Sequence, residues 1–237
     1  MATVIVSDDE EQCEIAPEIV KNTATDISVE MLFACGVYRS HDEKYLDIVN
    51  SVFKREIAAR KKEVPDFLKS VYPTIMTRDL AGEPKLEEFT NYIARTAWEV
   101  LNSQGYAMDH YTTHFFDCFG QEHHKYSGHD THTHPGAYIT GFYFLDVPKD
   151  SCRPVFQDPK AAKYHSSLLE KNPSMATLAS NEINYQPVAG DFFFTNSWLP
   201  HSFTRNAANK PMKFIHFSLG VSYKSPVITP DTPAVTI

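Results

Sequence analysis

The fold of this chain is built around His132-Thr-His-Pro-Gly136, which runs directly into Ala137-Tyr-Ile-Thr-Gly-Phe-Tyr-Phe-Leu145. The apolar and aromatic run has the length and the residue types of a buried β-strand. His132 and His134 are two residues apart, so in an extended backbone both side chains leave the same face. Two imidazoles held side by side by a rigid strand are the beginning of a transition-metal site.

A third ligand has to come from another part of the chain. The stretch Gly190-Asp-Phe-Phe-Phe-Thr-Asn-Ser-Trp-Leu-Pro-His201 again predicts a strand that runs into a turn, with a histidine at its end. The pattern therefore favours a metal site made from His132, His134 and His201. Histidines beside a strand are also compatible with loop residues that only form hydrogen bonds, and this alternative stays open.

The composition is that of a packed globular protein. The 237 residues are 42% hydrophobic and 13% aromatic, which predicts one domain with an elaborated helical flank. The net charge of −8 argues against a nucleic-acid partner, because phosphate binding needs a basic surface. The four cysteines lack C-x-x-C spacing, and the sequence shows neither a secretory signal nor an apolar run of membrane-spanning length. We therefore expect a cytoplasmic protein with reduced thiols and no membrane partner.

Residues 1–105 are predicted to form an N-terminal arm and a helical flank packed on a β core. An apolar run within 27–38 predicts an early strand. A capping-box pattern that begins at Ser40, followed by an apolar stripe, predicts an amphipathic helix over 41–62. A second stripe, opened by proline and closed by glycine, predicts a helix over 84–105.

From residue 106 onward, short apolar-aromatic runs alternate with Gly, Pro, Asn and Asp, which is typical of antiparallel β-structure. We predict a β core over 106–222 and an extended C-terminal tail over 223–237. A polar connection over 160–182 is predicted to lie near the mouth of the site. The predicted strands are 110–119, 137–145, 154–158, 192–196 and 213–221. Three further histidines are interpreted as polar loop residues, with a second metal-binding patch as the alternative: His123, His124 and His129.

Four pieces of this β region together resemble the iron(II)- and 2-oxoglutarate-dependent oxygenase superfamily. They are the stretches 132–145, 156–159 and 190–201 and the strand Lys213-Phe-Ile-His-Phe-Ser218. The nearest resemblance is to oxygenases with an H-x-H-P motif, and a more distant one is to prolyl hydroxylases. The resemblance implies a mainly β fold with flanking α-helices and a double-stranded β-helix (jelly-roll) core. It also implies Fe(II) and 2-oxoglutarate as cofactors, and hydroxylation of a substrate with release of succinate and CO2.

The resemblance also implies the metal ligands. Carried over by position, His132 is the first ligand and His201 is the distal one. The family usually has an acidic residue two positions after the first histidine, where this chain has His134. Either three histidines bind the metal, or a carboxylate such as Asp130 or Asp158 takes the place of His134. A neutral three-histidine site attracts Fe(II) less strongly than a site with one carboxylate.

In the family, a fixed cation binds the far carboxylate of 2-oxoglutarate. Lys213 stands where that basic residue stands, and Arg205 is the alternative. Lysine makes the charge pair without the bidentate fork of arginine. By alternation, His216 and Ser218 face away from Lys213, so His216 is interpreted as structural. Three residues are candidates to hydrogen-bond the co-substrate: Tyr138, Tyr143 and Ser218.

Two other functions are compatible with the same residues. One is a cupin-type enzyme in which three histidines hold a metal and no 2-oxoglutarate is used. The other is a non-enzymatic jelly-roll that serves as a binding module. No motif indicates the primary substrate, and a homo-oligomer is compatible with the sequence. We therefore predict a 2-oxoglutarate-dependent dioxygenase whose partners are its small-molecule co-substrate and an unknown primary substrate.

Overall fold

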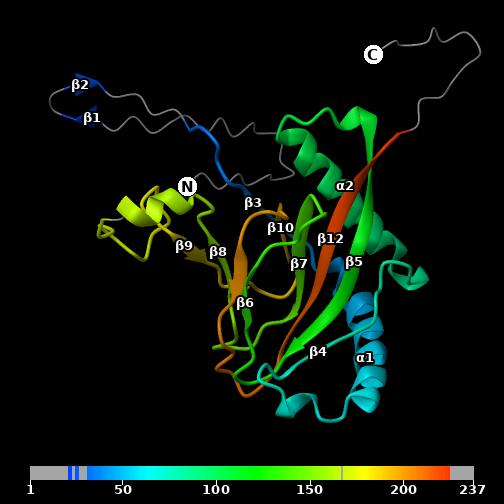
Figure 1. The fold of residues 1–237 in the computed structure, drawn as a ribbon. Coiled ribbons are helices and arrows are strands. Elements are labelled where there is room, and N and C mark those ends of the chain that lie inside the picture. The colour runs from blue at the N-terminus through cyan, green and yellow to red at the C-terminus, as the bar shows by residue number, and fades with distance from the viewer. Residues whose placement is uncertain (1–20, 23–24, 27–30, 167, 225–237) are drawn as a thin grey trace, which may run out of the picture.

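The computed structural model describes residues 21–22, 25–26, 31–166 and 168–224 (Figure 1). Two antiparallel sheets face each other, and two α-helices cover the outer face of the larger sheet. Residues 1–20, where the predicted N-terminal arm begins, and nearly all of the predicted tail at 223–237 lie outside the described residues. Within them, no helix is long and apolar enough to cross a membrane.

The main sheet has six strands. Their order is β3 (Val37–His41), β10 (Asp191–Asn196), β7 (Ile139–Asp146), β12 (Met212–Tyr223), β5 (Tyr111–His123) and β4 (Thr74–Met76). The smaller sheet has the order β6 (His129–His132), β11 (His201–Phe203), β8 (Pro154–Gln157) and β9 (Glu182–Asn184). A separate two-stranded pair is formed by β1 (Lys21–Asn22) and β2 (Thr25–Asp26). All pairings within these sheets are antiparallel, which confirms the predicted β class.

The helical layer forms because each helix has an apolar stripe. In α1 (Leu46–Glu63) the stripe includes the buried residues Val49 and Phe53, and in α2 (Glu87–Ser103) it includes Phe89 and Ile93. These side chains pack against outward-facing residues of β7, β10 and β12. Both predicted helices are therefore confirmed, and Gly105 ends the second with φ +93°, a conformation that favours glycine.

The start of the first helix differs from the prediction. The cap is Asp42, whose Oδ1 accepts a hydrogen bond of 2.9 Å from the backbone N–H of Lys44 in the 3-10 turn that precedes α1. Ser40 instead lies in β3, where its hydroxyl hydrogen-bonds to Tyr92 at 3.0 Å. The cap prediction was wrong because an adjacent aspartate offers the same interaction two residues later.

Two strands of the main sheet come from the part predicted as a helical flank. β3 pairs with β10 at one edge, and β4 pairs with the end of β5 at the other. The early strand predicted within 27–38 is only partly confirmed: residues 31–36 are not in a strand, β3 begins at Val37, and residues 27–30 lie outside the described part. The six-stranded sheet thus draws on the chain on both sides of residue 106.

The space between the two sheets is filled mainly by aromatic side chains. Phe142, Phe144 and Phe214 from the main sheet meet Phe156 and Phe203 from the smaller one, and all five are nearly or fully buried. The main sheet is therefore apolar on both faces, because helices cover its outer face and the smaller sheet covers its inner face. At one end of this interior, histidine side chains replace the aromatic ones.

Candidate metal centre

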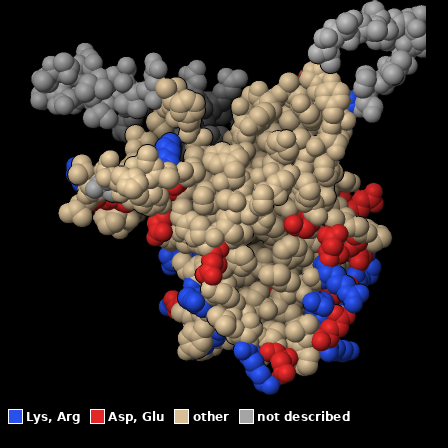
Figure 2. Space-filling model, viewed as in Figure 1, with Lys and Arg blue, Asp and Glu red and all other residues tan. Residues whose placement is uncertain are grey.

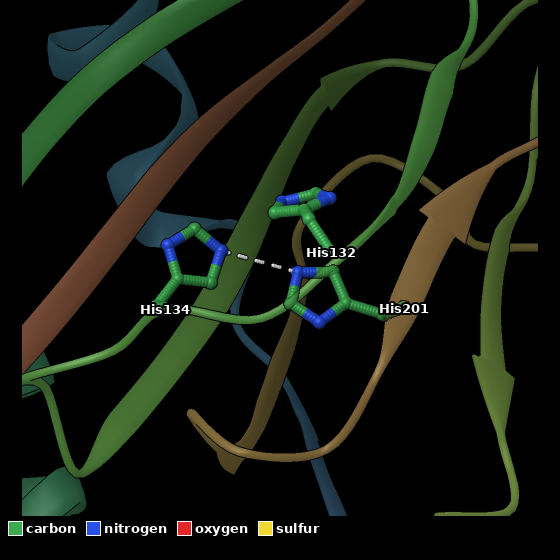
Figure 3. A group of neighbouring side chains, drawn as sticks. All are labelled: His132, His134 and His201. Carbon is green, nitrogen blue, oxygen red and sulfur yellow. Dashed lines mark hydrogen bonds between the residues drawn. The ribbon is translucent and has the colours of Figure 1, made fainter.

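The three histidines predicted as metal ligands come together at one end of the interior (Figure 3). One ligand nitrogen from each of His132, His134 and His201 lies within 4.8 Å of the other two. The Nε2 atoms of His134 and His201 are 3.2 Å apart. Two nitrogens that each lie about 2.0–2.1 Å from one metal ion are about 3 Å from each other, so this spacing suits shared coordination.

Backbone pairing positions each ligand. His132 ends β6 and is the register partner of His201, the first residue of β11. The backbone N–H of His134 donates to the carbonyl of Ser197 at 2.9 Å, which ties the segment after β6 to the segment before β11. Gly136, with φ +93°, then turns the chain into β7.

The imidazoles are held in orientations that leave a lone pair for a metal. Nδ1 of His201 lies 2.9 Å from the carbonyl of Leu199, and Nδ1 of His132 lies 2.8 Å from the carbonyl of Asp130. A carbonyl only accepts hydrogen bonds, so each Nδ1 carries the hydrogen and each Nε2 is free to bind.

Burial keeps this cluster neutral. Desolvation lowers the pKa of His201 to about 3 and that of His134 to about 4, and it also lowers the pKa of His132. Repulsion from neighbouring imidazoles adds to the effect at His134 and His201. Neutral imidazole is the form that binds metal, so the cluster is ready to coordinate at neutral pH.

A cavity of about 140 Å³ extends from the cluster into the space between the sheets. Its walls are aromatic side chains, a methionine, a glutamine and histidines. They are Met76, Phe119, Gln121, His129, His132, His134, Phe142, Phe203 and His216.

Sequence reasoning missed His216. Its ring stacks on that of His134 with the centroids 4.7 Å apart, and its Nε2 lies 3.1 Å from the hydroxyl of Thr140. On its other side, Nδ1 lies 3.2 Å from a carboxylate oxygen of Asp117. Burial alone would raise the pKa of Asp117, but interactions with His216 and Ser218 outweigh it and lower that pKa. The interpretation of His216 as structural was based on its facing away from Lys213, and that face is the one that carries the site.

Lys213 and Tyr143 are not brought to this cluster. Lys213 is paired across the sheet with Glu122, whose carboxylate binds Lys61 of α1, so this face of β12 is the helix-covered one. The ammonium of Lys213 donates to Asp146 at 3.1 Å. Tyr143 is fully buried against the helices, and its hydroxyl donates to the carbonyl of Asp42.

Ser218 and Tyr138 lie closer to the predicted site. Ser218 is buried on the same face of β12 as His216 and interacts with Asp117. Tyr138 follows the turn after His134, and its side chain is 47% exposed. Arg205, the alternative cation, donates to the carbonyl of Tyr126 and lies over the ring of Tyr72.

The two carboxylates considered as replacement ligands lie elsewhere. Asp130 is exposed and accepts a hydrogen bond of 2.6 Å from the hydroxyl of Tyr72. Asp158 forms an ion pair of 3.0 Å with Lys163 and lines a different cavity, beside the connection over 160–182. Among the residues that the structure describes, the candidate metal-binding group contains histidines alone.

The interpretation of His123, His124 and His129 as loop residues is wrong for His123 and His129, which lie in strands, whereas His124 lies outside any strand. His123 is the fully buried last residue of β5 and bonds to Gln121 at 2.8 Å. His124 follows the strand directly and lies 2.7 Å from the carboxylate of Glu122. His129 begins β6, and its Nδ1 is 3.1 Å from Nδ1 of His132, so it borders the metal cluster.

The outer end of the site is aromatic and poor in charge. Phe116, Tyr138 and Trp198 are each about half exposed, and a side chain at Gly136 would approach the ring of Phe116. Figure 2 shows charged side chains gathered over the lower half of the visible face, whereas the upper middle, over the upper ends of β5 and β12, is nearly free of them. A substrate that approaches the cluster from this side would contact aromatic side chains rather than charged ones.

Comparison with known families agrees with this geometry. Residues 120–217 match the sequence profile of the family described as "Putative 2OG-Fe(II) oxygenase". Over this part of the chain, the sequence is similar to that oxygenase family. The match contains all three histidines of the cluster and ends within β12.

Solved structures of low sequence identity also align with the chain, two of them with a TM-score of 0.50. A prolyl-4-hydroxylase from Pseudomonas putida has 12% identity and a TM-score of 0.50, over 78% of this chain and 93% of that one. AviO1 from Streptomyces viridochromogenes has 11% identity and a TM-score of 0.50, over 84% and 92%. A 2OG-Fe(II) oxygenase family protein from Burkholderia pseudomallei has 14% identity and a TM-score of 0.44, over 62% and 66%. No curated protein matches the chain.

The 2OG-Fe(II) oxygenase superfamily uses Fe(II) and 2-oxoglutarate. The donor set fits the metal, since three neutral imidazoles with converging nitrogens suit a divalent transition ion. The cavity beside the cluster fits the second cofactor less completely, because no lysine or arginine is among the residues that line it.

Proposed function

We propose that the protein is an Fe(II)- and 2-oxoglutarate-dependent dioxygenase that hydroxylates an unidentified substrate. The observation that carries the proposal is the convergence of His132, His134 and His201 within the region that matches the oxygenase family. We further propose that the two facing sheets form the jelly-roll core over 106–222, with His134 as the third metal ligand.

In the overall reaction, one atom of O2 is inserted into a C–H bond of the substrate, which becomes C–OH. The other oxygen atom enters 2-oxoglutarate, which loses its first carboxyl group as CO2 and becomes succinate. His132, His134 and His201 would hold Fe(II), which would supply the binding and reduction of O2.

The chain's own residues orient and shield this chemistry. The carbonyls of Leu199 and Asp130 accept hydrogen bonds from Nδ1 of His201 and of His132. This fixes the tautomer of each ring and leaves Nε2 of each one available to the metal. His216 packs flat on His134 and, being bonded to Thr140 in β7, limits rotation of that ligand. Aromatic side chains such as Phe142 and Phe203 line the cavity beside the cluster and limit the access of water to it.

The test is an anaerobic titration of the purified protein with Fe(II) and 2-oxoglutarate. We expect the weak visible charge-transfer band of a chelated 2-oxo acid, and then succinate release on admission of O2. The band should disappear in His132→Ala and His201→Ala. It should persist in His165→Ala, a matched control on the exposed 3-10 turn of the 160–182 connection.

A three-histidine dioxygenase that does not use 2-oxoglutarate is the second candidate. It is favoured by the neutral ligand set and by a cavity without a lysine or arginine. Stoichiometric iron that is lost in His201→Ala, without a band from any 2-oxo acid, would support it over our proposal. Absence of bound iron would support the binding-module alternative.

A further inference from the structure

The cavity beside the candidate metal cluster is lined by both His132 and His134. It offers room for the tail of a 2-oxo acid whose head would chelate a metal at the cluster. The side chains away from the ligands are Met76, Phe119, Phe142 and Phe203, with Gln121 as the one amide. The amide oxygen of Gln121 lies 2.8 Å from Nε2 of His123, which fixes the orientation of that amide.

Among the lysines and arginines whose side chains the structure describes, none lines this cavity. Lys213 is on the helix-covered face of β12 and is paired with Asp146. Arg60 reaches the backbone carbonyl of Met76 from α1, but its guanidinium pairs with Glu63.

Two other cations on neighbouring elements are also engaged elsewhere. Arg39 of β3 stacks over the ring of Phe193 at 5.0 Å and borders a different cavity, between β3 and α2. Arg205 is held by the carbonyl of Tyr126. The imidazole of His216 already faces the carboxylate of Asp117, so any positive charge there has its partner.

A tail carboxylate in this cavity would be taken out of water without a counter-ion. Burial of an ionised group is favourable only when a paired charge or several hydrogen bonds replace its hydration. An uncharged tail meets no such cost here, because aromatic rings and a methionine offer apolar contact and the amide of Gln121 offers a neutral hydrogen bond. A metal held by three neutral imidazoles would attract the carboxylate and 2-oxo group that chelate it, and this attraction would not favour a charged tail over an uncharged one.

We infer that the co-substrate cavity of this protein accepts a 2-oxo acid with an uncharged tail at least as tightly as 2-oxoglutarate. The inference rests on the proposed function and specifies the co-substrate class of that site. Among the described side chains, no lysine or arginine lines the cavity to favour the tail carboxylate of 2-oxoglutarate over an uncharged tail.

The experiment compares three 2-oxo acids on the anaerobic Fe(II) protein at pH 7.5. The probes are 2-oxoglutarate, its 5-carboxamide and 2-oxovalerate, and the dissociation constant of each is read from the charge-transfer band. We expect the two uncharged probes to bind as tightly as 2-oxoglutarate or more tightly. A 2-oxoglutarate dissociation constant more than about threefold below both others overturns the inference and leaves the proposed function standing. Absence of a band with all three acids overturns both.

Two variants test whether the charge of the cavity wall decides how tightly each 2-oxo acid binds. Met76→Lys places a cation at the cavity wall and should tighten 2-oxoglutarate binding about tenfold or more through charge pairing, with little change for 2-oxovalerate. Lys213→Met removes a cation from the other face of β12 and should leave all three dissociation constants unchanged. Weaker binding of 2-oxoglutarate alone in Lys213→Met would show that Lys213 does reach the tail, and would overturn the inference.

Discussion

The character of the site is set by one residue, His134. A histidine at this position adds a neutral ligand where a carboxylate would add a negative charge. Its ring is fixed between His201, with Nε2 atoms 3.2 Å apart, and His216, which stacks on its other side. A divalent metal held by these three histidines would keep its full double positive charge, which would strengthen its attraction for anionic ligands.

Replacing His134 by a carboxylate tests this directly. We expect His134→Glu to tighten Fe(II) binding by about tenfold, because one negative charge is added in contact with the cation. His134→Ala should weaken Fe(II) binding, because it leaves two ligands. The measurement is the Fe(II) dissociation constant by competition with a chelator under anaerobic conditions. Equal affinity in the wild type and both variants would mean that His134 is not a ligand.

Among the elements, β7 is the most constrained, because it lies between β10 and β12 and is covered on both faces. At Gly141 the backbone of the neighbouring strand comes so close that a Cβ atom would lie 2.2 Å from the carbonyl oxygen of Phe193. It would also lie 2.5 Å from the ring of Phe217. Neither neighbour can move without displacing a strand or a core ring.

Gly141→Ala should therefore destabilise the fold by about 3 kcal/mol, the cost of a forced core overlap. Gly82→Ala is the matched control, because a Cβ there meets nothing within 4 Å, and the change should stay within about 0.5 kcal/mol. The free energy of unfolding from urea titrations gives both values. A Gly141→Ala protein as stable as Gly82→Ala would contradict the close approach of β7 and β10.

The strands and the clustering of the three histidines could be predicted from the sequence because their signals are local. Runs of aromatic and β-branched residues mark β7 and β10, and the two-residue spacing of His132 and His134 puts them together. Alternation in β12 also separates Lys213 correctly from His216. Alternation does not say which face is inside, however, because β12 is apolar on both faces and only the helix layer distinguishes them. Taking Lys213 as the inward residue therefore assigned His216 to the wrong side.

For the whole molecule, the interior histidines make stability depend on pH. His123 is fully buried between Phe203 and Phe214, and burial lowers its pKa to about 3. In the unfolded chain its pKa is near 6.5, so between these values the unfolded state binds the extra proton. The contribution of neutral His123 is complete above pH 6.5 and is lost as the pH falls toward 3.

We expect the metal-free protein to lose stability between pH 7.5 and 5.5, with about 1 kcal/mol of that loss due to His123. His123→Gln keeps a hydrogen-bonding side chain next to Gln121 but has no proton to gain, so its loss should be smaller by that amount. Urea titrations of both proteins at the two pH values provide the comparison. The same loss in both would mean that His123 is already protonated, or solvated, in the folded state.

The pairing of β3 with β10 has a consequence for the order in which this protein is completed. A hydrogen bond joins His41 to Asp191 across 150 positions of the sequence, and the contact between His134 and His201 spans 67. During synthesis from the N-terminus, β3 leaves the ribosome long before its neighbour exists, and the metal ligands are separated until β11 has emerged. Structures dominated by such distant pairings form slowly, and their early strands stay open to wrong partners. Iron bound by all three histidines would therefore mark a late stage of synthesis, at which β12, the strand between β7 and β5, is the last one to join the main sheet.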